Sequence, residues 1–130
     1  KEEYYHEIDQ KGGLCTYLAV NESKTRLCMS CHNTNTVYCF GLDGQLHFVY
    51  KSENLIRPKG IGLDRDDNIY VAGYGSNNIH QLLPDGNLIR INKTGIHEKP
   101  WILTFNKSGN RILLTNISGN RHKCQIFVLK

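Results

Sequence analysis

Apolar residues along the chain fall into short runs separated by stretches rich in Gly, Asn, Asp and Ser. In the middle of the chain such runs cover 60–63, 69–72, 79–83 and 88–92. Runs of this length, bounded by turn residues, are typical of β-strands. Asp85-Gly86, between the last two runs, predicts a tight hairpin turn because glycine adopts the positive φ that such turns need. Helical periodicity is absent from the sequence, so we expect a chain made of short strands.

The same pattern recurs with a spacing of 42 residues. CHNTNTVYCFGLDGQL (31–46) aligns without gaps with GYGSNNIHQLLPDGNL (73–88), and PKGIGLD (58–64) aligns with PWILTFN (100–106) at the same spacing. Two independent pairs with one spacing indicate an internal repeat. A unit of this length that holds four strands has the size of one blade of a β-propeller.

The sequence therefore predicts one all-β domain, a partial β-propeller of about three four-stranded blades. The predicted blades cover 14–57, 58–99 and 100–130, and the third lacks its outer strand. One period before the outer strand of the first blade lies 4–9, which predicts an outer strand of a neighbouring blade or a strand that completes the last one. Three blades are half of a six-bladed ring, and each blade needs neighbours on both sides. We expect a piece of a longer parent whose upstream blades close the ring, or else a second copy that does so.

Composition and charge narrow the range of partners. Apolar residues make up 39% and charged residues 22% of the chain, as in folded domains. The longest apolar runs are too short to cross a bilayer, so we expect no membrane association. The net charge of +4 is uneven, because residues 1–98 carry −2 while residues 99–130 contain six basic and no acidic residues. Such a basic block attracts phosphate or an acidic partner, or is simply a solvated face.

The five cysteines do not have the spacing of a small disulfide framework. They are Cys15, Cys28, Cys31, Cys39 and Cys124. Most lie among apolar strand residues, where a free cysteine acts as a small hydrophobe. This pattern favours a reducing compartment and hence a cytoplasmic location. The sequence Cys28-Met29-Ser30-Cys31-His32 matches a c-type haem-attachment motif and contains part of the ligand set of a zinc site. Strand alternation argues against both interpretations, because it turns residues three apart to opposite faces of the sheet. We expect neither a cofactor nor a metal.

The segment PKGIGLDRDDNIYVAGYGSNNIHQLLPDG (58–86) resembles an NHL repeat. It contains Pro-x-Gly-Ile, an apolar-Asp pair, Asp-Asn-Ile-Tyr-Val, then Asn-x-Ile and Asp-Gly. The chain is similar to the C-terminal propeller of invertebrate tripartite-motif proteins, which carry RING, B-box and coiled-coil regions upstream and act as ubiquitin ligases or RNA regulators. The resemblance implies a non-catalytic binding module of NHL-type blades that recognises a protein target of the upstream ligase. Binding of single-stranded RNA through the basic, Trp-containing third blade is the alternative.

In such propellers the loops between blades, and those between the second and third strands of each blade, share one rim that serves as the binding face. Carried onto this sequence, the rim begins with Thr16, Lys59 and Trp101, just before the first strands. The candidate binding residues are His32, Lys59, Tyr74, Asn77, Asn78, Lys99, Trp101, Arg121 and His122. Two alternatives stay open for Trp101: it is exposed beside Lys99, Arg121 and His122 and stacks on a base or anchors a peptide, or it packs as a plug at the ring centre. The loops themselves are either a binding surface or ordinary solvated turns.

An enzymatic propeller is the remaining class to weigh. Such enzymes hold a divalent ion where the first strands begin, but the corresponding positions here carry Lys59 and Trp101, which cannot ligate a hard cation. A Gly-x-Ser-x-Gly motif and a Gly-rich phosphate loop are also absent from the sequence. The acidic stretch 64–67 is interpreted as a turn, and His47 and His80 as surface or edge residues. We therefore assign no catalytic residue, and ligase activity would belong to a longer parent.

Overall fold

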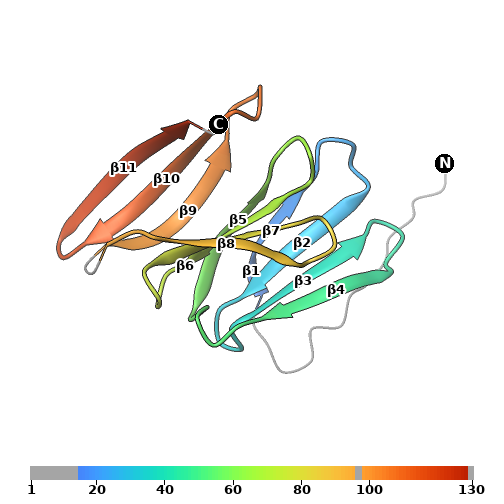
Figure 1. The fold of residues 1–130 in the computed structure, drawn as a ribbon, viewed down its shortest axis with the longest axis horizontal. Helices are drawn as coiled ribbons and strands as arrows, with labels where there is room; N and C mark the ends of the chain where they lie inside the picture. Colours follow the sequence, from blue (N-terminus) through green and yellow to red (C-terminus); the bar gives the residue numbers. More distant parts are fainter. Residues whose placement is uncertain (1–14, 96–97, 129–130) are drawn as a thin grey trace.

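The structure is a computed structural model that describes residues 15–95 and 98–128 (Figure 1). Within these ranges the chain forms eleven strands and no helix, which confirms the all-β prediction. The strands are β1 (Cys15–Val20), β2 (Arg26–Cys31), β3 (Thr36–Gly41), β4 (Leu46–Lys51), β5 (Pro58–Leu63), β6 (Ile69–Gly73), β7 (Asn78–Leu82), β8 (Leu88–Lys93), β9 (Lys99–Phe105), β10 (Arg111–Ser118) and β11 (Arg121–Val128). The strand predicted at 4–9 lies outside the described residues.

The described strands form three antiparallel sheets in chain order. β1 to β4 make the first, β5 to β8 the second, and β9 to β11 the third. Each sheet is a simple meander, the arrangement of a propeller blade. β5 contacts both β1 and β9, so the first strands of the three sheets lie side by side. Figure 1 shows the first and third sheets on either side of the second. The fold is therefore a partial β-propeller, as predicted.

The first turn of each blade is built in the same way. Asn21, Asp64 and Asn106 occupy corresponding positions, and the side-chain oxygen of each accepts hydrogen bonds from two backbone amides that follow it, at 2.9 to 3.0 Å. Short polar side chains of this kind stabilise turns by replacing backbone partners. The interpretation of 64–67 as a turn is confirmed.

Two apolar cores lie between the blades. Residues of the first two blades fill one core, and residues of the second and third fill the other. β6 contributes to both because successive strand residues face opposite sides: Ile69 and Val71 face the first blade, while Tyr70 and Ala72 face the third. The middle blade is thus buried on both faces, which makes it the stable centre of the arrangement.

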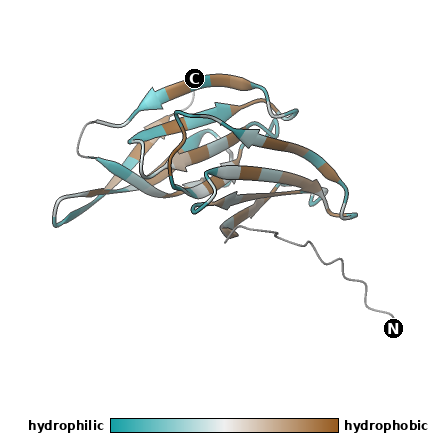
Figure 2. Ribbon diagram, turned by 90° about the horizontal axis from the view of Figure 1, so that it is seen from below, coloured by the Kyte–Doolittle hydropathy of each residue, from teal (hydrophilic) through white to brown (hydrophobic). Residues whose placement is uncertain are grey.

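The outward faces of the first and third blades remain apolar and exposed. Ala19 packs into the first core, so the alternating residue Leu18 points away and is 63% exposed. In the third blade Leu114 packs inward, whereas Leu113 and its cross-strand partner Ile126, 66% exposed, lie on the other face. Figure 2 shows apolar segments along the strands and hydrophilic hairpin tips. These faces have the character of surfaces that another blade covers.

The cysteines differ from the sequence-based expectation. Cys15 and Cys31 form a disulfide, so the prediction of free cysteines is wrong for this pair. The reason is strand register, because β1 pairs with β2 such that Cys15 lies directly opposite Cys31. Cys28 and Cys39 are buried thiols with their sulfurs 3.0 Å apart. Disulfides are typical of oxidising compartments, so the cysteines no longer favour a cytoplasmic location. Among the described residues there is no helix long and apolar enough to cross a bilayer.

His80 is fully buried on β7, which contradicts the expectation of a surface or edge position. β7 is an interior strand of its sheet, and the His80 ring on its face is contacted by Tyr50 of the first blade and by Asn54 of the following loop. The Tyr50 hydroxyl lies 2.8 Å from Nδ1 and the Asn54 carbonyl oxygen 3.0 Å from Nε2. Because a carbonyl only accepts, Nε2 carries the proton and Nδ1 accepts from Tyr50. Burial lowers the pKa of His80 below the ordinary value of 6.5, so the folded chain favours the neutral ring at neutral pH.

This burial predicts a pH-dependent stability. The unfolded chain takes up a proton on His80 at a higher pH than the folded chain does, so the free energy of unfolding falls as the pH drops below about 6.5. In the His80→Gln variant, chemical denaturation between about pH 7.5 and pH 5 should show a shallower fall than in the unmodified chain. His47→Gln, at an exposed position, should leave the slope unchanged. Equal slopes for all three proteins would contradict the prediction.

Candidate binding site

The first strand of each blade contains a β-bulge at the same place. The pairing of β1 with β2, of β5 with β6 and of β9 with β10 shifts around Thr16, Lys59 and Trp101 respectively. The sequence placed these residues before the first strands, but the structure includes them in the strands as the irregular positions. A bulge turns a side chain away from the regular alternation and is frequent beside binding sites. The irregularity of the backbone pairing therefore recurs at the equivalent place in all three blades.

Five side chains from all three blades meet beside these bulges. We call Tyr17, Lys59, Tyr74, Lys99 and Trp101 the aromatic–lysine cluster. The rings of Tyr74 and Trp101 pack edge to face, with centroids 5.6 Å apart at 67°. The ammonium of Lys59 lies 5.3 Å from the centroid of Tyr74 and 5.6 Å from that of Trp101, and the ammonium of Lys99 lies 5.3 Å from Tyr74. The indole N–H of Trp101 donates to the Tyr17 hydroxyl.

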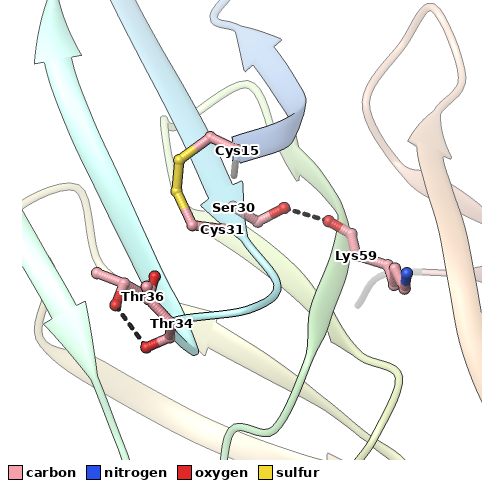
Figure 3. The surroundings of a disulfide bond; sticks show 6 residues. All are labelled: Cys15, Ser30, Cys31, Thr34, Thr36 and Lys59. Carbon is pink, nitrogen blue, oxygen red and sulfur yellow. Dashed lines mark hydrogen bonds between the residues drawn. A yellow bond between two sulfur atoms is a disulfide. The ribbon is translucent and has the colours of Figure 1, made fainter. Parts of the chain in front are cut away.

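The backbone beneath the cluster is held from the first blade. The Ser30 hydroxyl donates to the carbonyl oxygen of Lys59, and the neighbouring Cys31 is tied to Cys15 by the disulfide (Figure 3). Gly60, next to Lys59, allows β5 to approach the backbone of β9 closely. These contacts fix the bulge of β5 relative to both neighbouring blades. All five cluster residues are only partly exposed, so the cluster is a shallow, well-supported surface rather than a set of free side chains.

The structure thus brings together four of the predicted binding residues: Lys59, Tyr74, Lys99 and Trp101. The packing of Trp101 is intermediate between the two alternatives, an exposed anchor and a buried plug. Its indole is held by Tyr17 and Tyr74, while part of the ring reaches the surface. Sequence reasoning missed Tyr17. The available signal was its place directly after Thr16 in the repeat, but the direction of a side chain beside a bulge does not follow from the repeat.

The other five predicted residues lie outside the cluster. Asn78 is buried and structural, since its amide donates to the Asn54 carbonyl at 2.9 Å and accepts from Ser76 at 2.8 Å. Asn77, with a φ of 54°, is a turn residue. His32 is in the turn between β2 and β3.

Arg121 and His122 are exposed at the start of β11. His122 pairs with Ile117, which in turn pairs with Lys99, so the basic end of β11 lies two strands away from the cluster. The expected grouping of Trp101 with Arg121 and His122 is therefore not formed, because the Trp101 side chain packs toward the first and second blades.

A groove of about 600 Å³ lies between the second and third blades. Its polar lining includes Gln81, Arg90, Lys93, Glu98 and Gln125. The groove mixes charges of both signs with apolar walls. Within residues 15–95 and 98–128, no three side chains of His, Cys, Asp and Glu come together as a metal site would require. The aromatic–lysine cluster is the better-defined candidate.

Comparison with known families agrees with the fold. Residues 51–80, from the end of β4 to the middle of β7, match the family model of the SBBP β-propeller repeat. The chain contains a β-propeller repeat. The matched part of this propeller segment includes Lys59 and Tyr74, the two cluster residues of the second blade. No curated protein matches the chain.

Proposed function

We propose that the chain is a non-catalytic binding module that recognises a protein target through the aromatic–lysine cluster. The observation that carries this proposal is the meeting of Trp101, Tyr74 and two lysines from adjacent blades on a partly exposed, supported surface. Aromatic side chains packed in this way are the usual anchors of protein interfaces. A rigid β-scaffold also lowers the entropic cost of holding them in position.

The resemblance of 58–86 to an NHL repeat supports a more specific form of this proposal. In this form the module is the C-terminal NHL propeller segment of a tripartite-motif protein, and the bound protein is a target of the parent ubiquitin ligase. The exposed apolar faces of the first and third blades would then contact upstream blades of the same parent or a second copy of the chain. A cytoplasmic setting fits such a parent, although the Cys15–Cys31 disulfide does not favour it.

The proposal is tested by selecting peptides from a random library on the immobilised full chain and measuring their affinity by fluorescence anisotropy. Trp101→Ala and Tyr74→Ala should each weaken binding by about tenfold or more, as at interface anchors. Phe127→Ala, which removes an exposed aromatic ring outside the cluster, is the matched control. Peptides that bind all three variants equally well would show that the cluster is not the binding surface.

RNA binding is a second candidate, favoured by the exposed Arg121, His122 and Lys123 at the start of β11. Contacts of this kind neutralise phosphates, so affinity for single-stranded RNA would fall steeply with salt. Loss of RNA retention on Arg121→Ala would support this candidate, and the absence of retention by the unmodified chain would exclude it.

A further inference from the structure

We propose that Lys59 and Lys99 together form a carboxylate-binding site, and that the target presents acidic side chains to it. This inference rests on the proposed function, because it names the chemistry of the target at the same cluster. The two lysines come from neighbouring blades, on β5 and β9, and both ammonium groups lie 5.3 Å from the centroid of the one Tyr74 ring.

The charges of the cluster are unbalanced. Two like charges held beside one ring repel each other, and the repulsion is stronger at a partly buried surface than in bulk water. Among the described residues neither Lys59 nor Lys99 forms an ion pair with a carboxylate. Glu98, adjacent to Lys99 in sequence, is engaged by Lys123 at 3.2 Å. The side-chain carboxylates of an incoming acidic segment would therefore relieve the repulsion while making charge-assisted hydrogen bonds to the two lysines.

The aromatic rings favour an acidic peptide over a nucleic acid. Single-stranded nucleic acids bind by stacking bases on open ring faces. Here the ammonium of Lys59 covers a face of both Tyr74 and Trp101, and the two rings meet edge to face. The indole N–H of Trp101 is already donated to Tyr17. The rings are thus placed to hold the lysines and to flank a ligand, rather than to receive a base.

The site is also preorganised. The Ser30 hydroxyl fixes the carbonyl of Lys59, and the disulfide restrains the strand that carries Ser30. Because the lysine ammonium groups are already held over aromatic rings, less side-chain entropy is lost when a ligand binds. The basic excess of residues 99–130 adds a long-range attraction for an acidic segment.

The test uses an acetylated and amidated hexaglutamate peptide, which has side-chain carboxylates and no terminal one. Trp101 is the only tryptophan of the chain, so its fluorescence reports directly on the cluster. We expect hexaglutamate to change this emission in a saturable, salt-weakened manner, with hexaglutamine having no effect. The Lys59→Gln/Lys99→Gln double variant should bind a labelled hexaglutamate about tenfold or more weakly by anisotropy. The Lys51→Gln/Lys107→Gln variant has the same net charge but alters two exposed lysines outside the cluster, and it should bind as the unmodified chain does.

Other outcomes would overturn the proposal. Equal loss of affinity in both double variants would show a non-specific charge effect. A response of Trp101 to oligouridylate but not to hexaglutamate would assign the cluster to nucleic acid. If library peptides bind through Trp101 yet lack acidic residues, the carboxylate site is excluded while the proposed function stands. If no peptide depends on the cluster, both fail. Circular dichroism of each variant verifies that the β-fold is retained.

Discussion

Replacing Gly60 with alanine is expected to lower the free energy of unfolding by about 3 kcal/mol and to weaken binding at the cluster. A Cβ atom at this position would lie 2.5 Å from the Trp101 carbonyl oxygen, 2.8 Å from the Leu103 nitrogen and 2.9 Å from the Ile102 Cα. These are backbone atoms of β9, so no side-chain rotation relieves the overlap. The first strands of the second and third blades would have to separate, which also displaces Lys59 from Trp101. Urea denaturation and peptide anisotropy measure the two effects.

Gly62→Ala, on the same strand, is the comparison for this prediction. A Cβ there would meet side-chain atoms of Leu103 and Phe105 at 2.9 to 3.2 Å, and these can shift. We expect a smaller loss of stability, of about 1 kcal/mol, and unchanged binding. Equal effects of the two substitutions would show that the close approach of β5 to β9 does not control the cluster.

Truncating Leu82 to alanine is expected to cost about 3 kcal/mol of stability. Leu82 ends β7, is fully buried and belongs to the core between the first two blades. Removing its side chain loses buried apolar surface and leaves a cavity. In well-packed cores the two effects together lower the free energy of unfolding by about 2 to 5 kcal/mol. The midpoint of urea denaturation should fall while its slope stays the same.

Leu83 provides the matched control, because it is the adjacent leucine in sequence and is 42% exposed. Leu83→Ala should change the free energy of unfolding by less than about 0.5 kcal/mol. If the two substitutions destabilise the chain equally, the assignment of the core to the inward face of β7 is wrong.

Local signals in the sequence predicted most of the fold. The runs at 60–63, 69–72 and 79–83 correspond to β5, β6 and β7, because turn residues separate them. The Asp-Gly pairs at 43–44 and 85–86 form turns in which Gly44 and Gly86 have φ of 90° and 92°. The 42-residue spacing predicted the repetition of these elements as blades, since each copy has the same order of strand and turn signals.

The features that sequence reasoning missed depend on which strand faces which. The Cys15–Cys31 disulfide follows from the register of β1 against β2, and a shift of one residue would have separated the two sulfurs. His80 is buried because β7 is an interior strand of its sheet and because Tyr50 of the first blade and Asn54 of the following loop reach its ring. Neither the register of two strands nor the residues that face each other across a blade interface can be inferred from local composition.

The candidate site was partly predictable for the same reason. The repeat aligned Lys59 with Trp101 and so placed them at equivalent positions of neighbouring blades. The basic composition of the third blade, by contrast, wrongly suggested that Trp101 lies beside Arg121 and His122. Charge counts do not show that a side chain at a bulge points toward the preceding blade.

The recurring bulge has a consequence for how specificity could vary. Thr16, Lys59 and Trp101 lie at bulges, where the regular pairing between neighbouring strands is interrupted. The backbone hydrogen bonds of the sheet therefore place little constraint on which residue occupies these positions. Side chains as different as the ammonium of Lys59 and the indole of Trp101 already occupy equivalent positions in the second and third blades. Each of these two blades therefore contributes one exchangeable residue to the aromatic–lysine cluster, and new ligand preferences could arise by single substitutions there while the scaffold stays intact.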